Sequence, residues 1–169
     1  MIIKKQPPYS SSEKDPDRTR AEIEKLLRDY GVSGTQWTTL YDKQQVKLSF
    51  IVEAELKGQK KQIAIEVNPP LFLASRRTWN PKGYYEKVYA PNWAQSFRML
   101  FWWLKAKLEA VAYGLSTVEK EFLSQVVLSL ADGSQRTVGD ALTESIEKGV
   151  LQLEVRRQEP EIIESREVQ

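Results

Sequence analysis

The apolar positions in the first half of the chain repeat every second residue. From Val46 to Leu56, every even-numbered residue is apolar and most odd-numbered residues are polar. After a turn at residues 57–60, the alternation continues to Val67, and residues 36–41 are rich in strand-forming side chains. A period of two is typical of strands with one face on a core. Three such strands on short turns predict an antiparallel β-meander.

Helical spacing flanks the meander on both sides. Thr19 and Glu22 form a capping-box pattern before an apolar stripe that includes Ile23 and Leu27, which predicts a first helix. A longer stripe predicts the longest helix, at about residues 92–113. The members of that stripe are Trp93, Phe97, Leu100, Leu104, Leu108 and Val111.

Shorter elements follow the long helix. Ser116 with Glu119, and Thr137 with Asp140, repeat the capping pattern and predict two further short helices. The apolar residues 126–130 between them predict a fourth, short strand.

Residues 68–92 are punctuated by prolines and glycine, so we expect a long irregular connection there. The order of elements predicts an α+β fold, in which the meander packs against the long helix and two to three shorter helices. We expect one domain at residues 18–150, a flexible arm at residues 1–17 and a charged, frayed tail at residues 151–169.

The 169 residues include no Cys and no His. Cys/His zinc sites, iron–sulfur clusters, His-ligated haem, cysteine nucleophiles and Ser-His-Asp triads cannot form within such a chain. The sequence also contains no glycine-rich phosphate-binding motif. We therefore predict no cofactor and no metal, and carboxylate–lysine chemistry or binding without chemistry remains.

Charge is distributed unevenly, although the net charge is only +2. Residues 74–107 carry seven basic side chains and one acidic, a net charge of +6, whereas residues 108–169 carry −6. Such segregation favours an anionic partner, or a chain that neutralises itself by folding back. No signal-peptide pattern and no apolar run of about 20 residues is present, so we expect a cytoplasmic protein with no membrane partner.

Three sequence segments flank the predicted meander and together carry a resemblance. They are residues 21–31, 104–111 and 114–123. The second segment reads Leu-Lys-Ala-Lys-Leu-Glu-Ala-Val, and the third contains Glu-Phe-Leu. In this order they resemble a family of uncharacterised proteins from bacteriophages, prophages and bacteria, over about residues 19–142. The turn at residues 130–133 lacks the proline of a typical member. The resemblance implies a phage or mobile-element setting, and hence the host cytoplasm, but brings no assigned activity.

Basic and aromatic side chains alternate through residues 74–93, a pattern that favours nucleic-acid binding. Cations neutralise phosphates, and aromatic faces stack on bases at roughly 1–3 kcal/mol each. The candidate residues are Arg76, Arg77, Trp79, Lys82, Tyr84, Tyr85, Lys87 and Tyr89, with Arg98 at the start of the long helix. Alternatively, Trp79, Tyr85 and Trp93 fold inward as a small core and the charges are merely solvated.

Trp102 and Trp103 are adjacent on the predicted long helix. Neighbouring helical residues point about 100° apart, so both can be buried only if the helix is covered over a wide arc. One indole can instead serve an oligomer or a protein partner.

A carboxylate–lysine pattern is the one catalytic candidate. The pattern is weakly similar to the magnesium site of restriction-type nucleases. It consists of Glu53, Glu55 and Lys57 near a hairpin end, with Asp42 on the preceding turn. The alternation of the strand places these residues on its polar face, where cross-strand charge pairs are the ordinary explanation.

The leading hypothesis is a non-enzymatic accessory protein of a phage or mobile element that binds nucleic acid, single-stranded by preference. The first alternative is a protein–protein interaction or oligomerisation module that acts on a host or replication protein. The second alternative is a magnesium-dependent, nuclease-like enzyme.

Overall fold

The computed structural model describes residues 8–56, 58–130 and 132–151. Its helices are α1 (Pro16–Asp29), α2 (Trp93–Ala112), α3 (Val118–Phe122), the 3-10 turn η1 (Leu123–Gln125) and α4 (Val138–Glu147). Its strands are β1 (Gly34–Leu40), β2 (Gln45–Leu56), β3 (Gln59–Val67), β4 (Leu73–Asn80), β5 (Tyr84–Pro91), β6 (Val127–Ser129) and β7 (Gln135–Thr137). The predicted α+β fold is confirmed.

The predicted meander forms one antiparallel sheet in the order β1-β2-β3. In its register Leu48 lies opposite both Trp37 and Val67, and Phe50 lies opposite Ile65. Directly opposed residues share a face of a sheet. The alternation of β2 therefore places one apolar row on the same side as the apolar residues of β3.

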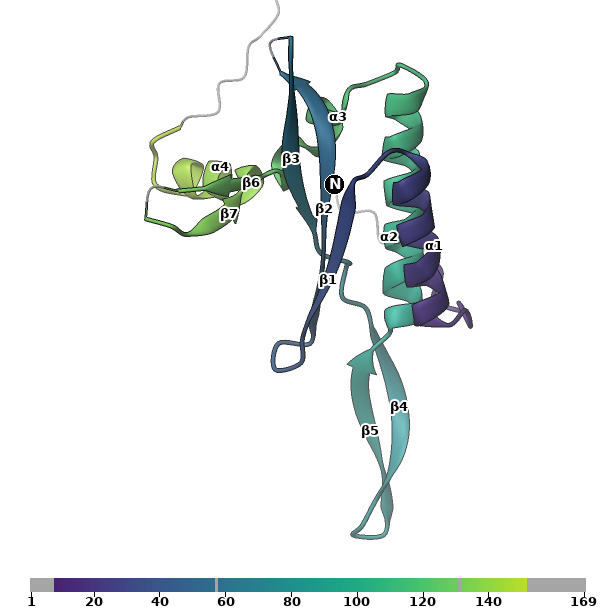
Figure 1. The fold of residues 1–169 in the computed structure, drawn as a ribbon. Helices are drawn as coiled ribbons and strands as arrows, with labels where there is room; N and C mark the ends of the chain where they lie inside the picture. Colours follow the sequence, from purple (N-terminus) through teal and green to yellow (C-terminus); the bar gives the residue numbers. More distant parts are fainter. Residues whose placement is uncertain (1–7, 57, 131, 152–169) are drawn as a thin grey trace, which may run out of the picture.

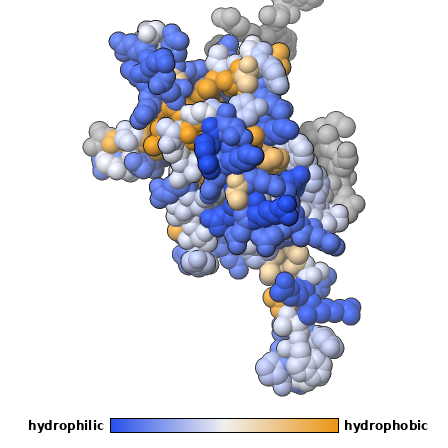
Figure 2. All heavy atoms as spheres, turned by 45° about the vertical axis from the view of Figure 1, so that its right-hand side comes forward, coloured by the Kyte–Doolittle hydropathy of each residue, from blue (hydrophilic) through white to orange (hydrophobic). Residues whose placement is uncertain are grey.

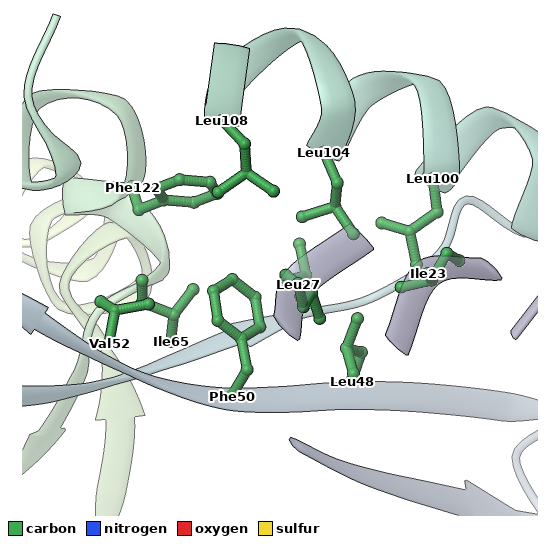
Figure 3. Packing of buried hydrophobic residues seen from close by; sticks show 11 residues of the cluster. Ile23, Leu27, Leu48, Phe50, Val52, Ile65, Leu100, Leu104, Leu108 and Phe122 are labelled. Carbon is green, nitrogen blue, oxygen red and sulfur yellow. The ribbon is translucent and has the colours of Figure 1, made fainter. Parts of the chain in front are cut away.

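Helices α1 and α2 lie side by side on that apolar face, and β6, β7 and α4 lie beyond the β3 edge (Figure 1). Leu27 and Leu104 are fully buried between the helices and the sheet, and Phe122 of α3 closes the core beside Phe50 (Figure 3). Ile23 and Leu100 meet one helical turn earlier, so the two helices run parallel. The middle parts of the stripes predicted from the sequence form this core, whereas Trp93 and Val111 at the ends of the α2 stripe are only half-buried.

Helix α1 begins one turn before the predicted start. Asp15 is its N-cap: the carboxylate accepts hydrogen bonds from the backbone N–H of Asp17 (2.7 Å) and Arg18 (3.1 Å). Pro16 occupies the first helical position, where its missing N–H costs nothing. Thr19, predicted as the cap, is instead buried inside the helix and donates to the carbonyl of Asp15.

The predicted arm contacts the body where the structure describes it. Helix α1 starts at Pro16, two residues inside the arm, and the carbonyl of Pro8 accepts a 2.8 Å hydrogen bond from the buried side chain of Gln95. Residues 1–7, and residues 152–169 of the predicted tail, lie outside the described residues.

Of the two helix caps predicted after α2, the one at α4 is confirmed and the one at α3 is wrong by one residue. The Thr137 hydroxyl accepts from the backbone N–H of Asp140 at the start of α4, as predicted. At α3 the cap is Thr117 rather than Ser116. The predicted short strand is present as β6, and it pairs with β7, which the sequence did not indicate.

The prediction of an irregular connection at residues 68–92 is wrong. Strands β4 and β5 form a separate antiparallel hairpin, closed at its base by a 2.7 Å hydrogen bond from the backbone N–H of Asn92 to the carbonyl of Phe72. Pro81 and Gly83 lie in its turn, and the prolines near 70 precede the hairpin.

Candidate nucleic-acid interface

The β4–β5 hairpin projects from the end of the molecule at which α2 begins (Figure 1), and it stands clear of the body in the space-filling view (Figure 2). Every residue from 73 to 89 except Asn80 is exposed. None of the hairpin side chains belongs to the hydrophobic core. The alternative small inward core is therefore absent for Trp79 and Tyr85, whereas Trp93 at the start of α2 is half-buried and stacks on Phe97, with ring centroids 5.6 Å apart.

A three-residue turn at Pro81–Gly83 joins the two strands. Gly83 has a φ of +90°, in the left-handed region that glycine adopts without a steric penalty, and its N–H donates to the carbonyl of Asn80 (2.9 Å). The Asn80 side chain accepts from the N–H of Lys82 (3.0 Å). The predicted site residue Lys82 therefore lies at the hairpin tip.

The register of the hairpin sorts its side chains into two faces. Arg77 lies opposite Lys87, whereas its neighbour Arg76 lies opposite Val88. Because consecutive residues of a strand point to opposite sides, these two arginines lie on opposite faces. What we call the Arg77 face consists of Ser75, Arg77, Trp79, Tyr85, Lys87 and Tyr89. What we call the Arg76 face consists of Ala74, Arg76, Thr78, Asn80, Tyr84, Glu86, Val88 and Ala90.

The Arg77 face combines cations and aromatic rings and has no carboxylate. Trp79 and Tyr85 meet edge to face, with ring centroids 5.0 Å apart. The ammonium of Lys87 lies 5.4 Å from the ring centroid of Tyr89. The single acidic residue of the hairpin, Glu86, lies on the other face, where the Asn80 amide donates to it (2.9 Å). Five of the eight candidate residues in the hairpin thus share one face.

The positively charged block found in the sequence divides in two. On α2 its three cations form ion pairs with carboxylates: Arg98 with Glu22, Lys105 with Glu109 and Lys107 with Glu121. Among the described residues, no carboxylate forms an ion pair with any cation of the hairpin. Within this block, the cations without a carboxylate partner are therefore those of the hairpin.

Arg98 was predicted as part of the site, but the structure gives it a different environment. Its guanidinium lies 3.4 Å from a carboxylate oxygen of Glu22 and 5.1 Å from the ring centroids of both Phe101 and Trp102. The side chain links α2 to α1 and does not lie on the Arg77 face. Its position in the basic block gave no sign of this ion pair.

Glu22 of α1 forms ion pairs with Lys14, just before the helix, and with Arg98 of α2, and these pairs depend on pH. A hydrogen bond from the Lys14 ammonium (2.5 Å), assisted by the positive charges of Lys14 and Arg98, holds the pKa of Glu22 below its ordinary 4.5. A carboxylate whose pKa is lowered by folding stabilises the folded state above its unfolded pKa, and this contribution is lost as the pH falls through the folded pKa.

We therefore expect Glu22→Gln to lower the free energy of unfolding by about 1 kcal/mol at neutral pH, since partly exposed ion pairs contribute little. The difference from the wild type should shrink below pH 4.5. Urea unfolding at several pH values measures it, with Glu24→Gln on the same helix as control. A difference that persists unchanged in acid would contradict the ion-pair explanation.

The two adjacent tryptophans have different environments. Trp103 packs edge to face against Phe122 at the margin of the core, with ring centroids 5.9 Å apart. Trp102 is 39% exposed and carries the Arg98 guanidinium and the Lys105 ammonium near its ring. Of the two alternatives that the sequence leaves open, burial of both indoles is not observed, because Trp102 lies at the surface.

The structure does not assemble the predicted nuclease-like site. Asp42 lies in the turn before β2, whereas Glu53 lies eight residues beyond Gln45, roughly 26 Å along the strand. Glu53 instead forms a 2.7 Å ion pair with Lys60, the cross-strand pair that polar alternation favours, and this raises the pKa of Lys60. Lys57 lies outside the described residues, and Glu55 is exposed opposite Lys60.

A cavity of about 530 Å³ lies between α2, the end of β3 and the start of α4. Its two carboxylates already have bonding partners, because Glu66 pairs with Lys47 (2.7 Å) and Asp140 accepts from the Thr137 hydroxyl (2.7 Å). Within the described residues, no three acidic side chains lie close enough together to hold a metal ion. The hairpin therefore remains the better candidate for a functional surface.

No protein-family model, no curated protein and no solved structure matches this chain. No helix in the described part of the chain has both the length and the apolar character needed to cross a membrane. The geometry of the hairpin is therefore the feature from which a function can be inferred.

Proposed function

We propose that the protein binds nucleic acid, with single strands preferred, through the Arg77 face of the β4–β5 hairpin. The observation that carries the proposal is the register, which gathers Arg77, Lys87 and three aromatic rings on one exposed face. Unpaired cations release condensed counterions from phosphates, and exposed rings offer faces on which bases stack.

The projection of the hairpin also supports the proposal. A two-stranded hairpin is at best marginally stable by itself, and this one exposes both faces. Exposed aromatic side chains are costly to retain without a partner, and the basic surroundings favour an anionic one. The phage or mobile-element setting remains part of the proposal, since a protein that handles single strands fits replication or repair of such an element.

Arg77 and Arg76 provide a matched test because they are neighbours of equal charge on opposite faces. We expect Arg77→Ala to weaken binding to a labelled oligothymidylate and to reduce the slope of log K against log salt by about 0.7. Arg76→Ala should change both quantities much less. Fluorescence anisotropy over a series of salt concentrations measures them.

Three results would count against the proposal: no binding at low salt, binding without a salt slope, or equal effects of the two arginine substitutions. If the strand does not bind even at low salt, the alternative of a protein-interaction module is favoured. The next experiment would then test whether the protein self-associates through the exposed Trp102. Analytical ultracentrifugation of the wild type and of Trp102→Ala measures this.

A further inference from the structure

The Arg77 face has an internal order that bears on how a strand would lie on it. From base to tip, Tyr89 lies opposite Ser75, then Lys87 opposite Arg77, then Tyr85 opposite Trp79. We call these pairs the first, second and third rungs. The outer rungs carry aromatic side chains and the middle rung carries two cations, so aromatic and cationic side chains alternate along the hairpin.

The rings of the outer rungs are open to a ligand. Trp79, Tyr85 and Tyr89 are 58%, 69% and 60% exposed. Trp79 and Tyr85 meet at an interplanar angle of 76°, so the edge of one ring contacts only one face of the other and the two rings do not stack. The Lys87 ammonium lies over one face of the first-rung Tyr89 ring, 5.4 Å from its centroid, so the opposite face is the one on which a base can stack. A base stacked on Tyr89 would therefore bring its phosphate toward the middle rung.

The spacing of the rungs favours an unstacked strand. At about 3.3 Å per residue, successive rungs are ~7 Å apart and the two aromatic rungs ~13 Å apart. Bases in one strand of a duplex are ~3.4 Å apart and covered on both faces by their neighbours. A duplex cannot offer base faces to both aromatic rungs, whereas a flexible single strand can, and it can follow the twist of the hairpin visible in Figure 1.

We infer that a single strand binds as on a ladder: bases stack on the first and third rungs, and the phosphates between them contact Arg77 and Lys87. This inference rests on the proposed function and deepens it. It assigns affinity for bases to the rings and salt dependence to the cations. The two roles can be measured separately.

The test is a thermodynamic cycle between one ring and the bases. Its probes are a labelled strand of ten thymidines and a strand of ten abasic residues, which keeps the phosphates and removes every base. We expect Tyr89→Ala to weaken binding to the thymidine strand about 5- to 150-fold with an unchanged salt slope. Binding to the abasic strand should change little. Tyr84→Ala on the Arg76 face is the matched control and should affect neither strand.

Two further variants separate stacking from an effect on the hairpin itself. Tyr89→Phe keeps the aromatic face and should bind like the wild type. Tyr89→Leu keeps apolar bulk without an aromatic face and should bind like Tyr89→Ala. A duplex that contains the thymidine strand should bind more weakly than the single strand at the same salt concentration.

The ladder is overturned if Tyr89→Ala weakens binding to both strands equally, or if the duplex binds as tightly as the single strand. Salt-dependent binding that responds to Arg77→Ala would still support the proposed function in that case. If no strand binds at low salt, the proposed function itself fails. The experiment therefore distinguishes failure of the ladder from failure of nucleic-acid binding.

Discussion

Replacing the hairpin Leu73–Pro91 by a short Gly-Ser turn is expected to abolish binding to single-stranded DNA and to leave the rest of the fold in place. The hairpin carries four basic residues and all the aromatic side chains of the Arg77 face, so no phosphate contact or stacking surface of the proposed site would remain. Anisotropy with a labelled oligothymidylate should show no binding at low salt.

The structure also explains why the remainder should fold. The hydrogen bond between Asn92 and Phe72 shows that the two ends of the hairpin lie close together, so a few residues can join them. No hairpin residue belongs to the core cluster. The helix N-cap at Asn92 lies outside the deleted segment and is retained. Circular dichroism and a cooperative thermal transition close to that of the wild type are the necessary control.

Retained binding by this folded variant would place the nucleic-acid site outside the hairpin and contradict the proposal. A variant that fails to fold would show that the hairpin supports the base of α2. The point substitutions at Arg77 and Tyr89 would then carry the test, because they leave the backbone of the hairpin intact.

The core could be predicted from the sequence because each of its elements shows a hydrophobic period. Leu48 and Phe50 in β2, Ile23 and Leu27 in α1, and the middle of the α2 stripe from Phe97 to Leu108 are predicted in the core and are buried, whereas Trp93 and Val111 at the ends of that stripe are half-buried. A period survives in the sequence wherever one side of an element is covered and the other is exposed.

The hairpin was missed for the same reason. Neither of its faces touches the core, so no apolar alternation marks it. Asn80-Pro81-Lys82-Gly83 between strand-forming residues was a usable turn signal, but the prolines nearby favoured an irregular loop. The chemistry of the site was thus predictable from composition, whereas its division into two faces required the register.

Ion pairs between distant segments also lay beyond the sequence. Arg98 and Glu22 are 76 positions apart and meet only because α1 and α2 run parallel on the sheet. Asp42 and Glu53 are much closer in sequence, yet β2 carries them to opposite ends of the sheet. Neither the ion pair of Arg98 nor the separation of Asp42 from Glu53 could be predicted from distance along the sequence.

Phe122→Ala is expected to produce the largest loss of stability among single substitutions considered for this chain. The ring of Phe122 is fully buried and meets Phe50 of β2 and Trp103 of α2 edge to face, at centroid distances of 5.8 and 5.9 Å. Truncation removes contacts to two layers at once and leaves a cavity that rigid neighbours cannot close. The free energy of unfolding should fall by about 3–5 kcal/mol, measured by urea titration.

The next residue supplies the control. Leu123 is 56% exposed, so Leu123→Ala should change the free energy of unfolding by no more than about 0.5 kcal/mol. Under conditions where Phe122→Ala remains folded, it should bind oligothymidylate with wild-type affinity, because its ring lies in the core and the Arg77 face lies outside it. Equal losses in the two variants would contradict the assignment of Phe122 to the core, and weakened binding by folded Phe122→Ala would show that the hairpin depends on that core.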